Sequence, residues 1–276
     1  MSSRFYKMSG SGNDFVFLDG RQHQLNDWTP ERIRQVCDRR QGVGADGVVH
    51  FSVLPDGALR MVYYNADGSH ADMCGNAALC STRLAVRLGL ANPEQVALAT
   101  DAGRLESRCV GPGALAELKF PTAAVPVPIG IPLRQGELRA FQGTVGVPHT
   151  IVLVEEVASI DVDTRGRELR HAPIVGPAGS NINFIGATGD RTTPWALRTY
   201  ERGVEAETLA CGTGTIAAAL AVGSAGLAEL PIQIRAGSGS VYSVSAVLNG
   251  AEASDVWLCG EGRLVFSGEF GPGLSG

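Results

Sequence analysis

Two similar stretches of sequence decide the fold, CGNAALCSTRLAVRL at residues 74–88 and CGTGTIAAALAVGS at residues 211–224. Each begins with a cysteine and a glycine and continues as an alanine- and leucine-rich run, which predicts a buried helix. The two cysteines lie 137 positions apart (residue 211 against residue 74) in a chain of 276 residues, so each half carries one. A period this long indicates a duplicated domain and not a solenoid.

Short β-branched and aromatic runs surround the two helices and predict an α/β fold. The predicted strands are 14–19, 47–53, 59–64 and 115–120 in the first half, and 142–154, 181–187, 196–200, 231–235, 241–247, 255–259 and 263–269 after it. A helix is predicted at 30–39, with Thr29 as its N-cap and Ile33 and Val36 on its apolar side.

The proline-rich stretch PTAAVPVPIGIP at residues 121–132 is unsuited to a central strand or a helix and is predicted to be a linker. The predicted domains are therefore residues 1–118, carrying Cys74, and residues 119–262, carrying Cys211. A last strand near 263–270 is expected to return to the first domain.

The composition excludes several classes of protein. There are 28 acidic against 23 basic residues, a net charge of −5, which argues against nucleic-acid binding, and 44% of the residues are hydrophobic, as in a globular chain. The N-terminal stretch lacks the apolar run of a signal peptide, and residues 212–228 are too short and too rich in glycine and alanine to span a membrane. We therefore expect a cytoplasmic protein without a membrane partner.

The six cysteines have no CxxC spacing, which argues against structural zinc and against a disulfide framework, so no metal is expected. Four of them are expected to be free thiols that behave as small hydrophobes: Cys37, Cys80, Cys109 and Cys259. Cys74 and Cys211 differ because each is predicted to begin a helix. The positive end of a helix stabilises a thiolate and lowers the pKa of the thiol.

Two such helix ends facing each other would bring a thiolate and a thiol to opposite sides of one carbon, which is the geometry of two-base racemisation. The backbone N–H groups at each end could also bind a substrate carboxylate, and Gly75, Gly212 and Gly214 would let the substrate approach closely. A pyridoxal phosphate enzyme needs a Schiff-base lysine. The only lysines are Lys119, on the strand predicted at 115–120, and Lys7, where a further strand is expected near the N-terminus. Neither has a phosphate loop nearby, so no cofactor is expected.

Four segments resemble the diaminopimelate epimerase family: residues 9–21 (SGSGNDFVFLDGR), 42–49 (GVGADGVV), 64–77 (YNADGSHADMCGNA) and 200–215 (YERGVEAETLACGTGT). The resemblance covers nearly the whole chain. It implies two pseudo-symmetric α/β domains, each a curled, mostly antiparallel sheet around a central helix, with the active site between them. It also implies cofactor-independent conversion of LL- to meso-diaminopimelate, a step of lysine and peptidoglycan precursor biosynthesis, in an enzyme that tends to form homodimers.

The resemblance also assigns residues. It makes Cys74 and Cys211 the proton-exchanging pair, with Cys74 as donor and Cys211 as acceptor, and places His149 and Glu201 beside them to bind the α-ammonium and tune proton transfer. The positions that match the family's substrate-binding residues are Asn13, Asn65, Gly75, Asn76, Asn181, Glu201, Arg202, Gly212 and Thr213.

Several positions depart from the family pattern, and three of them bear on which substrate is bound. Val147 replaces the asparagine of a frequent Asn-Pro-His, and Ala77 and Leu79 stand where CGNGxR has glycine and arginine. These changes leave open a related cofactor-independent racemase of another amino acid, such as histidine. Two further classes are a thiol hydrolase or transferase with one nucleophilic cysteine and His149 as base, and a binding protein that never exchanges the α-proton of its amino acid.

Overall fold

The computed structural model of the chain describes residues 4–271, so residues 1–3 of the predicted first domain lie outside the described residues. The described chain divides into two compact units. The first reaches to Lys119 and resumes at Cys259, and the second is Phe120–Leu258. Both contain sheets and helices, as the α/β prediction requires, and none of the helices within residues 4–271 is long and apolar enough to cross a membrane.

The first unit is built on a mostly antiparallel sheet. Its strands are β1 (Arg4–Gly10), β2 (Asn13–Asp19), β3 (Gly47–Val53), β4 (Leu59–Asn65), β5 (His70–Ala71), β6 (Val96–Thr100), β7 (Gly103–Val110), β8 (Leu115–Phe120) and β19 (Arg263–Glu269). Strand β2 pairs in parallel with β3 and β4 pairs in parallel with β6, whereas β1–β2, β3–β4, β4–β5, β6–β7 and β7–β8 are antiparallel. Strand β19 pairs antiparallel with β1.

The second unit repeats this order. Its strands are β9 (Ala123–Ala124), β10 (Val127–Pro128), β11 (Glu137–Val145), β12 (Val147–Val154), β13 (Asn181–Ala187), β14 (Trp195–Glu201), β15 (Ala206–Thr208), β16 (Ile232–Arg235), β17 (Val241–Asn249) and β18 (Glu252–Glu261). Strands β12–β13 and β14–β16 are the parallel pairs, and β11–β12, β13–β14, β14–β15 and β16–β17 are antiparallel. The two units are therefore pseudo-symmetric, as the repeat of the two cysteines predicts.

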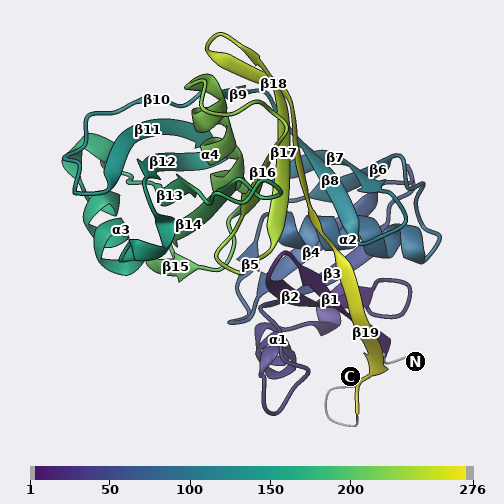
Figure 1. Ribbon diagram of the computed structural model, residues 1–276. Helices are drawn as coiled ribbons and strands as arrows, with labels where there is room; N and C mark the ends of the chain where they lie inside the picture. The colour runs from purple at the N-terminus through teal and green to yellow at the C-terminus, as the bar shows by residue number, and fades with distance from the viewer. Residues whose placement is uncertain (1–3, 272–276) are drawn as a thin grey trace. The chain divides into compact units, whose positions relative to one another are not determined.

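Each sheet curls around one central helix (Figure 1). Helix α2 (Gly75–Arg87) contacts β1, β4, β6, β7 and β19, and α4 (Gly212–Ser224) contacts β11, β12, β13, β14, β16 and β17. Both helices have 13 residues and begin directly after a cysteine, as predicted. Every residue from Gly214 to Val222 is buried, because a helix enclosed by its own sheet has no face turned to water.

Two further helices lie outside the sheets. Helix α1 (Pro30–Cys37) has the predicted N-cap, since the Thr29 side chain accepts from the Arg32 N–H, but it ends two residues earlier than expected because Asp38 leaves helical geometry. Helix α3 (Val162–Arg170) was not predicted from its charged sequence. The short 3₁₀ helices are η1 (Leu25–Asp27), η2 (Val157–Ser159) and η3 (Pro173–Val175).

The remaining differences from the sequence prediction are local. The strand expected at 142–154 is a hairpin of β11 and β12, because Gly146 turns the chain at a φ of +69°. The predicted linker at 121–132 contains the two-residue strands β9 and β10. Strands β5, β6, β7 and β15 had not been predicted.

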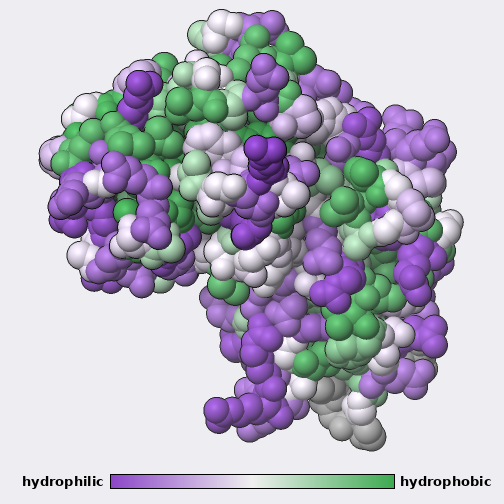
Figure 2. All heavy atoms as spheres, in the orientation of Figure 1, coloured by the Kyte–Doolittle hydropathy of each residue, from purple (hydrophilic) through white to green (hydrophobic). Residues whose placement is uncertain are grey.

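Each unit has its own apolar core beneath its outer helix. The first packs Phe5, Val16 and Ile33, with the rings of Phe5 and Phe270 4.7 Å apart, and the second packs Phe184 and Tyr200 with residues of α3 and β12. Apolar surface also remains outside the cores, and Figure 2 shows such surface in the region of β19. On that strand Val265 and Phe266 are 47% and 46% exposed.

Candidate active site

Cys74 and Cys211 are the N-cap residues of the two central helices. Their backbones are almost identical, with φ and ψ of −134° and 120° at Cys74 and −131° and 106° at Cys211. Neither side chain caps its own helix. The first N–H groups of a helix have no partner within it, so each cysteine lies beside backbone donors and the positive end of a helix dipole, which together favour a thiolate and an anionic ligand.

The other four cysteines have no such surroundings. Burial raises the pKa of Cys37 and of Cys259 to about 11, and it also raises the pKa of Cys80 and Cys109. All four are free thiols. They remain protonated at neutral pH and act as small apolar side chains, as expected from the sequence.

In the first unit the structure joins two predicted site residues into one network. The Asn76 Nδ2 donates to Asn13 Oδ1 at 2.7 Å, and the Asn13 Nδ2 donates to Asp46 Oδ2 at 3.0 Å. Arg39 in turn donates to Asp46 Oδ1 at 2.7 Å. The carboxylate of Asp46, which was not singled out from the sequence, therefore fixes how the Asn13 amide is turned.

An ion cluster anchors this network to β1 and β2. Asp14 accepts from both terminal nitrogens of Arg39, at 3.0 and 2.8 Å, and lies 2.6 Å from Lys7 Nζ. Burial alone would raise the pKa of Asp14, but the hydrogen bonds and charges of Arg39 and Lys7 outweigh it and lower the pKa to about 2. Asp14 is therefore ionised throughout the physiological range, and Lys7 serves an ion pair.

Asn65 lies at the end of β4, apart from this hydrogen-bond network. Its Nδ2 donates to Ser69 Oγ at 3.0 Å and its backbone N–H donates to the Ser69 carbonyl at 2.9 Å, which closes the turn into β5. Glu201 occupies the corresponding end of β14 in the second unit and accepts from Thr208 Oγ1 at 2.8 Å. Burial raises the pKa of Glu201, and the Thr208 hydroxyl opposes this rise.

His149 is fully buried on β12, next to Asn181 in the parallel strand β13. Desolvation lowers the pKa of His149 to about 4; the Val145 carbonyl opposes this shift and the charge of Arg202 adds to it. The imidazole is thus neutral at physiological pH. Its Nδ1 lies 3.2 Å from Asn183 Nδ2, and its Nε2 is buried without a hydrogen-bond partner among residues 4–271.

The remaining predicted residues of the second unit surround the start of α4 and the end of β14. The Asn181 Oδ1 accepts from the Arg202 backbone N–H at 2.7 Å, and Cys211 Sγ lies 3.7 Å from Thr213 Oγ1. A Cβ added to Gly214 would lie 2.3 Å from Asn183 Oδ1 and 3.2 Å from Cys211 Sγ. The first turn of α4 is therefore pressed against Asn183, a close approach that only glycine permits.

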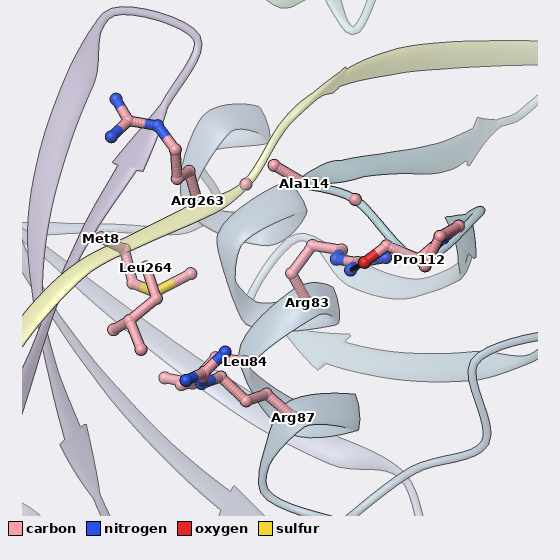
Figure 3. A pocket seen from close by; sticks show the side chains of 10 residues that line it. Met8, Arg83, Leu84, Arg87, Pro112, Ala114, Arg263 and Leu264 are labelled. Carbon is pink, nitrogen blue, oxygen red and sulfur yellow. Dashed lines mark hydrogen bonds between the residues drawn. The ribbon is translucent and has the colours of Figure 1, made fainter.

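The first unit also contains a hollow of about 200 Å³, whose lining side chains Figure 3 shows. Met8, Leu84 and Leu264 form its apolar part, and Arg83 and Arg263 line it. The Arg83 guanidinium is held by the carbonyls of Gly111 and Pro112, both at 3.1 Å, and Arg263 Nε donates to Glu261 at 2.8 Å. None of the predicted site residues lines this hollow.

Comparisons with known proteins show the family to which the chain belongs. The sequence model of the family described as diaminopimelate epimerase matches residues 5–119 and 141–248. The chain belongs to the diaminopimelate epimerase family. It is 42% identical to a diaminopimelate epimerase from Gemmatimonas aurantiaca, over 96% of this chain and 98% of the relative. As a member of this family the chain is an enzyme of the isomerase class.

Solved structures share the fold at low sequence identity. A phenazine biosynthesis protein of the PhzF family from Bacillus anthracis has a TM-score of 0.68 at 15% identity, covering 98% of this chain and 99% of that one. A hydroxyproline epimerase from Agrobacterium vitis has a TM-score of 0.64 at 16% identity, covering 99% and 94%. At these identities the likeness concerns the fold alone.

Proposed function

We propose that the chain epimerises LL-2,6-diaminopimelate to meso-diaminopimelate without a cofactor, as a step in lysine and peptidoglycan precursor biosynthesis. Cys74 and Cys211 exchange protons at one α-carbon from its two faces. The observation that carries this proposal is the equivalence of the two cysteines, each the N-cap of a central helix with the same extended backbone. Family membership supplies the substrate.

The reaction needs one thiolate and one thiol. In the direction from LL to meso, the thiolate of Cys211 takes the α-proton and the electron pair of the C–H bond moves toward the substrate carboxylate. The thiol of Cys74 then gives its proton to the opposite face of the carbon. The reverse direction exchanges the two roles, so no proton is gained or lost overall.

The helix ends stabilise the charge that builds on the substrate carboxylate. The backbone N–H groups of Gly75, Asn76, Gly212 and Thr213 belong to the first turns of α2 and α4, where donors are oriented before the reaction begins. Preorganised donors of this kind are worth about 3–4 kcal/mol each in other enzymes.

The remaining predicted residues hold the substrate. Asn13, Asn65 and Asn181 offer amide groups whose orientation the structure fixes through Asp46, Ser69 and the Arg202 backbone. The guanidinium of Arg202 suits a bidentate contact with a carboxylate. The raised pKa of Glu201 reflects burial, and pairing with the substrate ammonium would restore its ionised form.

Proton exchange in deuterated water tests the proposal. With LL-diaminopimelate we expect deuterium to enter at one α-carbon as meso product forms. Mass spectrometry and NMR measure this incorporation. Exchange with histidine or another amino acid, and none with diaminopimelate, would instead support a racemase of that amino acid. Binding of diaminopimelate without any exchange would support a non-catalytic protein.

We also propose that the chain forms a homodimer, in line with its family. The apolar side chains Val265 and Phe266, each about half exposed on β19, support a contact with a second copy. Sedimentation of the wild type and of a Val265→Ser, Phe266→Ser variant tests this, because the variant is expected to be a monomer. A wild type that sediments as a monomer at micromolar concentration would contradict it.

A further inference from the structure

Behind the start of α4 lies a buried trio of polar side chains, His149, Asn183 and Thr199. His149 and Asn183 have no exposed surface and Thr199 is 3% exposed. The Thr199 hydroxyl donates to Asn183 Oδ1 at 3.0 Å, and Asn183 Nδ2 lies 3.2 Å from His149 Nδ1. Three neighbouring strands, β12, β13 and β14, thus each supply one member.

The groups around Asn183 determine which side of its amide carries the nitrogen and which the oxygen. Its nitrogen faces the backbone carbonyls of Thr150 and Asn181 at 3.3 and 3.4 Å, and a carbonyl can only accept a hydrogen bond. The amide nitrogen must therefore be on the side of His149 Nδ1, to which it can only donate. A neutral imidazole that accepts at Nδ1 carries its proton on Nε2.

The first unit shows that the fold does not need this trio. In the parallel pair β2–β3, Phe15 faces Gly47 just as His149 faces Asn181 in β12–β13, and Val49 pairs with Tyr63 just as Asn183 pairs with Thr199. The equivalents of the trio are Phe15, Val49 and Tyr63. The same sheet is thus built with a phenyl ring and an aliphatic side chain where the second unit buries an imidazole and an amide.

We propose that Asn183 is a positioning residue that holds His149 as the neutral Nε2–H tautomer, so that His149 serves the reaction as a hydrogen-bond donor and not as a base. This inference rests on the proposed function. The donor at Nε2 is buried and makes no complete hydrogen bond within residues 4–271, although the Val145 carbonyl acts on the imidazole, and a buried donor is costly unless it gains an acceptor. The acceptor is an anionic group, which a carboxylate of the substrate supplies.

The charged groups around His149 fit a neutral donor. Arg202 is the cation whose charge acts on the imidazole, and it disfavours a second positive charge there. On α4, a Cβ added to Gly214 would lie 3.2 Å from Cys211 Sγ and 2.3 Å from Asn183 Oδ1, so the cysteine is the ionisable side chain of α4 that lies beside the trio. The positions that pair with His149 on β11 and β13 are Gly143 and Asn181, which do not titrate.

The first measurement is NMR of protein labelled with ¹⁵N-histidine, with His149 assigned by its loss in a His149→Phe variant. Between pH 6 and 8 we expect Nδ1 to resonate as an unprotonated nitrogen and Nε2 as a protonated one. A proton on Nδ1, or a charged imidazole at pH 7, would overturn the inference.

The second measurement uses Asn183→Asp, which replaces the donor by an acceptor of the same shape. The carboxylate is expected to draw the proton to Nδ1 and to raise the pKa of His149, with kcat for epimerisation reduced at least tenfold and KM changed less than threefold. The acidic limb of the kcat profile moves to higher pH. Unchanged kcat despite a reversed tautomer would show that the tautomer does not serve the reaction and would overturn the proposal.

Thr199→Val is the matched control. It removes one hydrogen bond from the same buried trio but leaves the two carbonyls that orient the amide, so the Nε2–H tautomer is expected to persist, with kcat within threefold of wild type. A loss of kcat as large as in Asn183→Asp with the tautomer intact would assign the effect to packing. If no amino acid is epimerised at all, the proposed function fails, while the NMR result on the tautomer stands by itself.

Discussion

The two units build the same scaffold but support their cysteines by different means. In the first, the start of α2 rests on charges, because Asn76 and Asn13 lead to Asp46 and Arg39. In the second, the start of α4 rests on the neutral buried trio His149–Asn183–Thr199. The strand order and the cysteine N-caps are common to both, so the two units differ in the side chains that lie behind equivalent helix starts.

The contrast extends to single atoms in the first turn of each helix. Ala77 and Gly214 are both the third residue after their cysteine, yet only Gly214 faces a side chain, Asn183, that leaves no room for a Cβ. Glycine is therefore needed at position 214 because the Asn183 amide leaves no room for a Cβ. The variants described next test whether this contact or the shared fold determines the residue.

The largest expected effect comes from the cysteines themselves. Cys74→Ala and Cys211→Ala are each expected to reduce epimerisation by about 10³-fold or more, because the proposed mechanism needs both thiols as acid–base groups. Steady-state assays with LL- and meso-diaminopimelate check this. Cys80→Ala, a buried thiol in α2, is the control and is expected to retain activity. Full activity in either single variant would favour an enzyme with one nucleophilic cysteine.

The next effect concerns Gly214. Gly214→Ala is expected to lower the free energy of unfolding by about 1–3 kcal/mol, since its Cβ would overlap Asn183 Oδ1. Gly75→Ala is a glycine-to-alanine control in the first turn of the other helix, where a Cβ meets no atom within 4 Å, and it is expected to stay within about 0.5 kcal/mol of wild type. Urea denaturation measures both. Equal losses would show that the two helix starts are packed alike.

A third effect is the pH dependence of stability, to which His149 of the second unit contributes. The pKa of His149 falls from 6.5 to about 4 on folding, so the unfolded chain binds a proton first and stability decreases as the pH drops through this window. From pH 7 to pH 5 this group alone removes about 2 kcal/mol.

Urea denaturation of the wild type and of His149→Phe at pH 7 and pH 5 checks this. The variant copies Phe15 of the first unit, and its free energy of unfolding is expected to fall by about 2 kcal/mol less than that of the wild type. The pKa of Asp14 is lowered to about 2, so the stability it contributes is complete above pH 4 and lost only as the pH falls from 3.8 toward 2. If His149→Phe loses as much free energy of unfolding between pH 7 and pH 5 as the wild type, the prediction that His149 is buried as a neutral imidazole is wrong.

The smallest effect tests the charged support of the first unit. Asp46→Ala removes the acceptor that orients Asn13 and is expected to raise KM by about five- to tenfold with a small change in kcat. Asp56→Ala breaks an exposed pair with Arg104 and serves as the control, with KM near wild type. Unchanged KM in Asp46→Ala would mean that Asn13 does not depend on this carboxylate for substrate binding.

Much of the fold followed from local patterns. A cysteine–glycine opening before an alanine-rich run predicted both central helices, and Thr29 before Pro30 predicted the start of α1. The sequence does not predict helix α3 because five of its nine residues are charged and its apolar residues are few. Its Arg165 is buried only because Glu137, distant in sequence, pairs with it at 2.7 Å, and no local pattern reveals such a partner.

The predicted site residues were assigned from motifs that match the family. Asp46, Asn183 and Thr199 were not among the residues assigned in this way. A polar residue on a strand has the same appearance in sequence whether it faces water or a buried imidazole. Only the register of β12, β13 and β14 places Asn183 between His149 and Thr199. Strand pairing therefore shows which polar side chains meet in the core, and the spacing of residues along the sequence does not.

The pairing of β19 with β1 has a consequence for how the chain is made. Among the strands within residues 4–271, β19 is the last to be synthesised and its partner β1 is the first. The second unit, Phe120–Leu258, is complete in sequence while the first still lacks its closing strand. Domains usually fold in the order of synthesis, N-terminal first. Here the order is reversed at this step, because the unit whose synthesis begins first gains strand β19 only after residues 263–269 have been synthesised.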